Sequence, residues 1–199
     1  MREPLVDDAP APSVRLAAVD VGKTVRVSRR HRRQILEGVD FSFEPGSLTA
    51  VMGPSGAGKT TLLDVLRTGA CNTGAITING APLSRRTARQ LIKTIPQDDV
   101  LLPGLTAAEM LSFAAQLSLP RNATRAERAE RVGSVMRELH LSEEDGRTQI
   151  GSVDDRGLSG GQRKRVSIGI ELLAQPAVLL VDEPTSGLDA KMAHSVVSI

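Results

Sequence analysis

The chain has 199 residues, 40% of them hydrophobic and 24% charged, and its 25 lysines and arginines nearly balance its 23 aspartates and glutamates. These proportions fit one globular domain and exclude a disordered, collagenous or disulfide-rich chain. The near-even charge gives no reason to expect a nucleic-acid partner. No apolar stretch approaches the roughly 20 residues that span a bilayer, and the acidic, proline-rich residues 1–13 are predicted to form a flexible tail without a signal peptide.

The first part of the chain is predicted to form strands. Alternating apolar residues favour strands at Val14–Val21, Thr24–Ser28 and Ile35–Phe43, and the basic run Arg29–Arg33 between them is interpreted as a solvated loop. The short apolar run Leu48–Met52 follows a turn and is predicted to be a buried central strand.

A glycine-rich segment comes directly after this run. Residues 53–60 match the pattern G-x-x-x-x-G-K-[ST], and a helix is predicted from Thr61 to Leu66. In this pattern glycines let successive backbone N–H groups face phosphate oxygens at a helix N-terminus. Lys59 is expected to reach the β- and γ-phosphates of a nucleotide, and the Thr60 hydroxyl to hold Mg²⁺. The predicted nucleotide-binding residues here are Gly53, Pro54, Ser55, Gly56, Ala57, Gly58, Lys59, Thr60 and Thr61.

The middle of the chain is predicted to be mainly helical. A strand at Gly74–Gly80, a short helix at Arg85–Leu91 and a strand at Ile92–Ile95 come first. Capping boxes at Thr106–Glu109 and Thr124–Glu127 then start two helices. The shift in composition predicts a helical subdomain, at about residues 98–165, inserted into an α/β core.

Two carboxylates end the apolar run Val178–Val181, which is predicted to be a buried strand. Asp182 at the tip of such a strand, beside a phosphate loop, is placed to hold Mg²⁺ through water. Glu183 is expected to point the other way, where it can orient or deprotonate a water molecule.

The pentapeptide Leu158–Gln162 (LSGGQ) precedes a predicted helix from Arg163 to Ala174. Ser159 is expected to cap this helix, while Gly160 and Gly161 leave backbone N–H groups bare for an anion. One chain therefore offers two phosphate sites for one nucleotide. A symmetric head-to-tail dimer satisfies both, because each nucleotide then lies between the phosphate loop of one subunit and the Ser159 segment of the other.

These motifs together resemble the nucleotide-binding domain of ABC transporters, from about Val14 to the end of the chain. The resemblance covers a Walker A motif at residues 53–60, Gln97 as the Q-loop glutamine, the signature at residues 158–162, a Walker B motif at residues 178–183 and a D-loop at residues 186–189. The segments 102–109, 159–169 and 182–189 are similar to the G, or white-type, subfamily of half-transporters.

The resemblance implies the P-loop ABC ATPase fold, with a mixed β-sheet core, an antiparallel β-subdomain and the inserted helical subdomain. It also implies ATP and Mg²⁺ as cofactors, and ATP hydrolysis that powers export by a half-transporter on the cytoplasmic face of a membrane. The expected partners are a second nucleotide-binding domain, identical or different, and the membrane domain of the parent chain. The expected site comprises Lys59, Gln97 and Glu183 for catalysis, Thr60, Gln97 and Asp182 for the metal, and Ser159, Gly160, Gly161, Gln162 and Asp189 for nucleotide contacts beyond the phosphate loop.

Two features depart from the wider ABC pattern. The chain has no tyrosine or tryptophan to stack on adenine, so affinity is expected to rest on the phosphates and Mg²⁺. The switch histidine of the family belongs a few tens of residues after Walker B, whereas His194 follows Glu183 by 11 positions (194 − 183). The sequence is therefore interpreted as a C-terminally truncated fragment that lacks this histidine, with impaired turnover. Two alternatives stay open: a soluble ABC ATPase of the translation-factor or DNA-repair type, and a catalytically inactive nucleotide-binding fragment.

Overall fold

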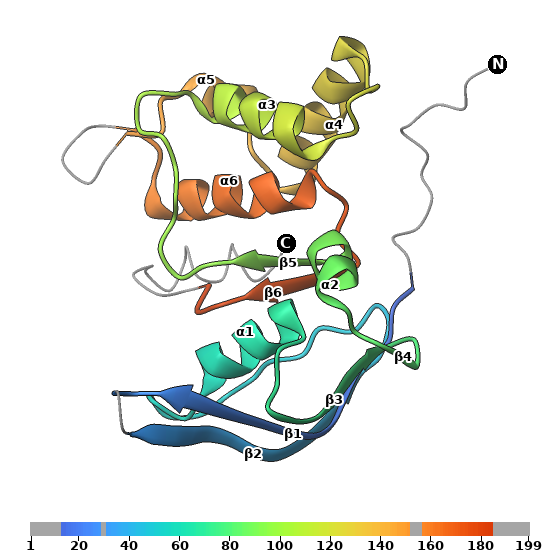
Figure 1. Ribbon diagram of the computed structural model, residues 1–199. Coiled ribbons are helices and arrows are strands. Elements are labelled where there is room, and N and C mark those ends of the chain that lie inside the picture. The colour runs from blue at the N-terminus through green and yellow to red at the C-terminus, as the bar shows by residue number, and fades with distance from the viewer. Residues whose placement is uncertain (1–12, 29–30, 152–156, 185–199) are drawn as a thin grey trace. The chain divides into compact units, whose positions relative to one another are not determined.

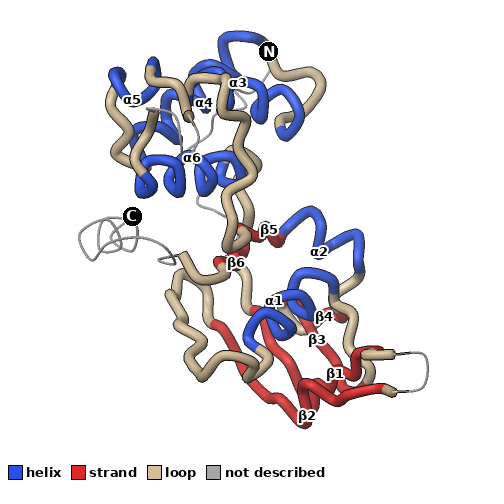
Figure 2. The backbone as a smooth tube through the Cα atoms, turned by 90° about the vertical axis from the view of Figure 1, so that its left-hand side faces the viewer, coloured by secondary structure: helices blue, strands red, loops and turns tan. Residues whose placement is uncertain are grey.

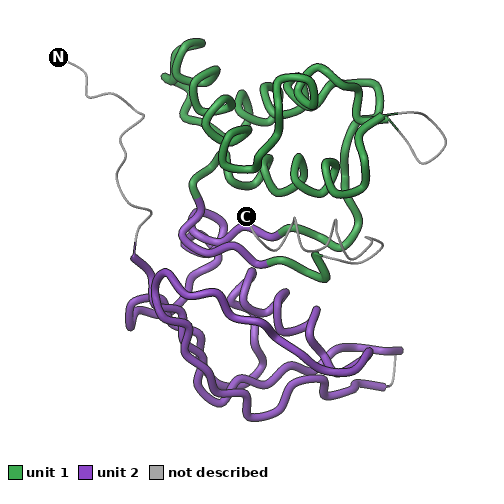
Figure 3. Tube along the Cα trace, turned by 180° about the vertical axis from the view of Figure 1, so that it is seen from behind, with its two compact units in different colours: residues 1–9, 95–175, 181–199 green, residues 10–94, 176–180 purple. Residues whose placement is uncertain are grey.

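A computed structural model describes residues 13–28, 31–151 and 157–184. The chain forms two compact units (Figure 3). The first, here called the sheet unit, contains residues 10–94 and 176–180, and the second, the helical unit, contains residues 95–175 and the chain from residue 181 on. The chain passes between the two units along strands β5 (Ile92–Ile95) and β6 (Val178–Val181), which form a two-stranded sheet.

The sheet unit is built on a four-stranded antiparallel sheet in the order β2-β1-β3-β4 (Figure 1). Its strands are β1 (Leu16–Arg26), β2 (Arg32–Phe43), β3 (Thr73–Ile78) and β4 (Ala81–Pro82). Helices α1 (Lys59–Thr68) and α2 (Arg85–Leu91) complete the unit. The buried residues of its core are aliphatic, and Phe41 and Phe43 of β2 are half-buried against them. Leu16 and Val21 of β1 and Val65 and Leu66 of α1 are all at most 1% exposed.

The helical unit consists of helices α3 (Ala107–Ser118), α4 (Arg125–Glu138), α5 (Glu143–Arg147) and α6 (Gly160–Leu172), drawn as blue coils in Figure 2. The predicted capping boxes at Thr106 and Thr124 are both present, and each hydroxyl accepts a bond from the backbone N–H three residues on. The Thr106 backbone and side chain also donate to Glu109, and these bonds hold the pKa of the Glu109 carboxyl below its ordinary value.

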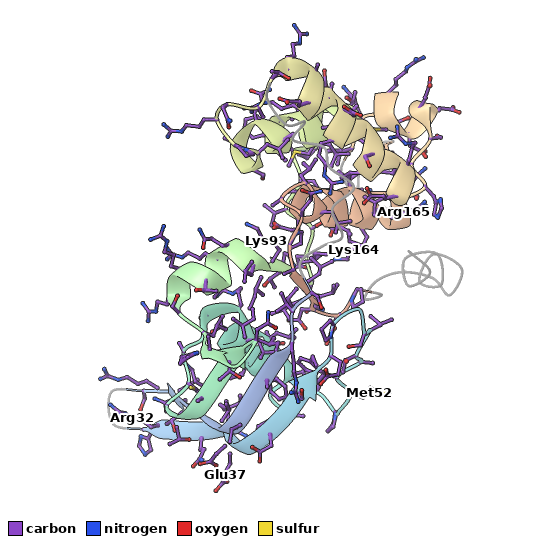
Figure 4. The ribbon with its side chains drawn as sticks, turned by 90° about the vertical axis from the view of Figure 1, so that its right-hand side faces the viewer. Arg32, Glu37, Met52, Lys93, Lys164 and Arg165 are labelled. Carbon is purple, nitrogen blue, oxygen red and sulfur yellow. The ribbon has the colours of Figure 1, made fainter. Side chains whose placement is uncertain are left out.

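Three expectations about strands need correction. Leu48–Met52 belongs to neither sheet, and Leu48 and Met52 are 91% and 89% exposed. Figure 4 labels Met52 on this segment. A strand is stabilised by backbone partners, and in the described residues none pairs with this segment. The strands predicted at Val14–Val21 and Thr24–Ser28 form one strand, β1. Its pairing with β2 shifts register between Ala18 and Thr24, and the strand continues through the residues between the two predicted segments. In β6 only Leu180 is buried, because among the described residues that strand pairs with β5 alone.

Gly169 allows close packing of α6 in the helical unit. A Cβ at this position would lie 2.8 Å from Leu139 Cδ1, 3.0 Å from Leu111 Cδ2 and 3.2 Å from Val135 Cγ1. We expect Gly169→Ala to destabilise the unit by about 1–3 kcal/mol, because three packed side chains must shift. Gly133→Ala is the control: its Cβ would approach only Arg137 Nη1, at 3.4 Å, and losing a helix-interior glycine should stabilise by about 0.5–1 kcal/mol. Urea unfolding of both variants measures this, and stabilisation by both would contradict the packing argument.

Candidate nucleotide-binding site

The glycine-rich loop belongs to the sheet unit and leads directly into α1. Gly56 and Gly58 have φ values of 78° and 96°, in the left-handed region that side chains other than glycine rarely adopt. A Cβ on Gly58 would also lie 3.1 Å from Ile35 Cγ2 and 3.4 Å from the Ile35 carbonyl oxygen. Gly56 and Gly58 are therefore required by backbone conformation and, at Gly58, also by the close approach of β2.

The N-terminus of α1 is the one helix start in the described chain without a side-chain cap. Gly58 occupies its N-cap position and makes no side-chain hydrogen bond, whereas α2 to α6 are each capped by a serine or threonine. The first N–H groups of a helix have no partner inside it, and the helix dipole adds positive potential there. Lys59 Nζ donates to the Gly53 and Pro54 carbonyl oxygens at 2.9 and 3.1 Å, which holds an ammonium group at the loop. The arrangement suits a bound anion.

The carboxylates Asp182 and Glu183 follow β6 in the helical unit. The Asp182 backbone N–H donates to the Ile95 carbonyl oxygen at 3.0 Å, so Asp182 lies beside the end of β5. Asp182 is half-buried and Glu183 is exposed, with a left-handed φ of 44° at Glu183. The backbone thus gives two adjacent carboxylates different surroundings, and Asp182 is placed near the segment that carries Gln97.

Residues 96–99 follow β5 and contain Gln97. This segment is held by Lys164 of α6, whose Nζ donates to the Pro96 carbonyl oxygen at 3.1 Å, the Gln97 carbonyl oxygen at 2.9 Å and Asp99 Oδ1 at 3.0 Å. Lys164 is not among the site residues expected from the sequence, where it stands in the basic run Arg163–Arg165. The local sequence carries no signal for its role, because the three acceptors lie 65–68 residues away.

The LSGGQ segment starts α6 as predicted. Ser159 is the N-cap, its Oγ accepts from the Gln162 backbone N–H at 3.2 Å, and Gln162 Oε1 accepts from the Ser159 backbone N–H at 2.8 Å. The Gln162 amide also donates to Asp145 of α5. The Gln162 side chain is therefore engaged within the helical unit, and its contact with nucleotide stays a prediction. Asp189 and His194 lie outside the described residues.

The side chains expected to hold Mg²⁺ are Thr60, which is exposed in the sheet unit, and Gln97 and Asp182 in the helical unit. Hydroxyl, amide and carboxylate oxygens are the ligands that this hard cation takes, and it usually keeps several waters and binds nucleotide phosphates. The described residues contain no cluster of three or more His, Cys, Asp or Glu side chains for a metal held by protein alone. The chemistry of these side chains, each taken by itself, suits Mg²⁺ bound together with nucleotide phosphates.

Comparison with known proteins identifies the family of the chain. The model of the family described as ABC transporter matches residues 36–186, about three quarters of the chain. The chain belongs to the ABC transporter family. This ABC transporter chain is 48% identical over 164 residues to ABC transporter G family member 22 of Arabidopsis thaliana, covering 81% of the chain and 22% of that relative. It is 43% identical over 166 residues to human ATP-binding cassette sub-family G member 8, covering 81% of the chain and 24% of that relative.

The chain therefore spans about a quarter of the length of these two G-family relatives. Among solved structures, it is similar to a dimeric ATP-binding cassette in a post-hydrolysis state bound to ADP and Pi, with a TM-score of 0.73, 26% identity, and coverage of 92% of this chain and 80% of that one. The predicted family and ABC ATPase fold are confirmed. No helix in the described part of the chain is long and apolar enough to cross a membrane.

Proposed function

We propose that this chain is the ATP-binding and ATP-hydrolysing domain of an ABC half-transporter of the G subfamily. The observation that carries the proposal is the start of α1, which has no side-chain cap. There Gly56 and Gly58, with left-handed φ values, and the Lys59 ammonium form a site suited to an anion, here called the phosphate cradle. The family match and the identities of 41–48% to G-family relatives support the same function.

In this proposal the residues act in distinct roles. Lys59 and the first N–H groups of α1 bind the phosphates, and Thr60, Gln97 and Asp182 hold Mg²⁺, which neutralises phosphate charge when bound. Glu183 orients the attacking water and accepts its proton. Gly160 and Gly161 of a second subunit, with Ser159, contact the phosphates from the other side, and Asp189 is proposed as a further nucleotide contact.

The proposed partners are a second nucleotide-binding domain in a head-to-tail dimer and a membrane domain on the cytoplasmic face of a membrane. The dimeric ABC cassettes among the solved relatives support the first partner. The G-family relatives, which extend well beyond this chain's length, support the second. No nucleic acid is proposed as a partner.

The absence of tyrosine and tryptophan gives a direct test. Because binding rests on the phosphates, we expect inorganic tripolyphosphate with Mg²⁺ to displace a fluorescent ATP analogue from the chain, while adenosine leaves it bound. Fluorescence anisotropy measures both competitions. Displacement by adenosine but not by tripolyphosphate would contradict the phosphate-cradle assignment, and failure of the ATP analogue to bind would contradict the proposed function.

A further inference from the structure

Lys164 is the most buried charged residue in the described part of the chain. Its side chain is 3% exposed and Asp99 is 22% exposed. A buried ammonium group is tolerated only when its donors are satisfied, since the alternative is an unpaired charge away from water. Lys164 uses all three N–H donors on Pro96, Gln97 and Asp99, which lie within four consecutive residues.

The hydrogen bonds of Lys164 connect two parts of the proposed site, the segment of residues 96–99 and the start of α6. Lys164 lies on α6 five residues after Ser159, so it is rigidly joined to the helix that the LSGGQ segment begins (Figure 4). Its acceptors include the backbone carbonyl of Gln97 itself. Both groups belong to the helical unit. The Lys164 ammonium therefore fixes the backbone of residues 96–99 relative to the start of α6.

We propose that Lys164 is a positioning residue that sets the Gln97 backbone for its role at the metal and couples it to the Ser159 end of α6. This inference rests on the proposed function. In a head-to-tail dimer, Gln97 serves the nucleotide of its own subunit, whereas the Ser159 segment serves the nucleotide of the other. Lys164 thus gives a physical connection between the two nucleotide sites through a single side chain.

The side chains next to Lys164 provide a matched control. Arg165 also donates to two backbone carbonyls, those of Leu139 and His140, at 3.3 and 3.2 Å. These acceptors lie at the end of α4, away from residues 96–99 in the sequence. Arg165→Met therefore removes a cation and its carbonyl contacts from the same helix while leaving the Gln97 segment attached to Lys164.

The test measures the ATP dissociation constant of the full chain by isothermal titration calorimetry, once with Mg²⁺ and once with EDTA. We expect Lys164→Met to leave binding in EDTA unchanged and to reduce the gain in affinity from Mg²⁺ by about 10- to 100-fold, the usual effect of losing a group that orients a metal ligand. Arg165→Met should retain the gain. Lys164→Arg, which restores a cation with several donors, should recover part of it.

The outcomes separate the inference from the proposed function. If wild-type protein binds ATP with a Mg²⁺-dependent gain and Lys164→Met retains that gain, or Arg165→Met loses it equally, Lys164 is structural only and the inference is overturned. If wild-type protein fails to bind ATP, the proposed function is overturned as well. Should Lys164→Met fail to fold, Asp99→Asn removes the charged acceptor with little change in shape. A reduced Mg²⁺ gain in that variant supports the inference, and an unchanged gain overturns it.

Discussion

Lys59→Ala should weaken binding of Mg·ATP by about 100-fold or more. Each hydrogen bond from a charged donor contributes about 1.5–3 kcal/mol, and the ammonium at the phosphate loop is expected to contact both the β- and γ-phosphates. The structure already holds Nζ at the loop through the Gly53 and Pro54 carbonyls, so the group is pre-positioned. Isothermal titration calorimetry with Mg·ATP measures the change.

Lys23→Ala is the matched control for this variant. Lys23 belongs to the same unit and its ammonium also donates to a backbone carbonyl, that of Ala70, but it lies in β1 and outside the loop. We expect it to bind Mg·ATP like the wild type. If the Lys59 and Lys23 variants lost affinity equally, the loss of a positive charge at either position would explain the effect. That result would contradict the phosphate-loop assignment.

In the complete half-transporter of the proposed function, Glu183→Gln should lower the rate of ATP hydrolysis by about 10²- to 10⁴-fold while leaving ATP affinity intact. The amide keeps the shape of the side chain but cannot accept a proton from water. Glutamine also tolerates the left-handed φ of 44° no worse than glutamate, so the backbone is preserved. Because hydrolysis is required to reopen the proposed dimer, ATP should accumulate in a dimeric form. Phosphate release and gel filtration with ATP measure the two effects.

The neighbouring carboxylate distinguishes proton transfer from metal binding. Asp182→Asn should reduce the Mg²⁺-dependent part of ATP affinity, because Asp182 is the half-buried carboxylate at the end of β6 beside Ile95. The Glu183 variant should keep that part. Normal hydrolysis by Glu183→Gln would mean that another group accepts the proton, and identical binding defects in both variants would contradict their separate roles.

The sequence by itself determined the features that depend on neighbouring residues. Helix starts at Thr106, Thr124 and Ser159 follow from side-chain oxygens that bond to backbone N–H groups three residues on. The phosphate loop is similarly local, because positive φ values at Gly56 and Gly58 are a property of glycine itself. The residues of the phosphate loop and of the Ser159 segment were therefore available from motif and spacing, whereas the roles of Gln97 and Asp189 were implied only by the resemblance to ABC transporters.

Tertiary structure alone decided what depends on distant partners. The run Leu48–Met52 has the composition of a buried strand, yet it is exposed, because a strand needs backbone partners that composition does not specify. Lys164 shows the reverse difference. In the sequence it is one of three consecutive basic residues, which are typical of an exposed surface, and in the fold it is buried. Its acceptors are 65–68 residues earlier, and only the packing of α6 against residues 96–99 brings them within reach of one ammonium group.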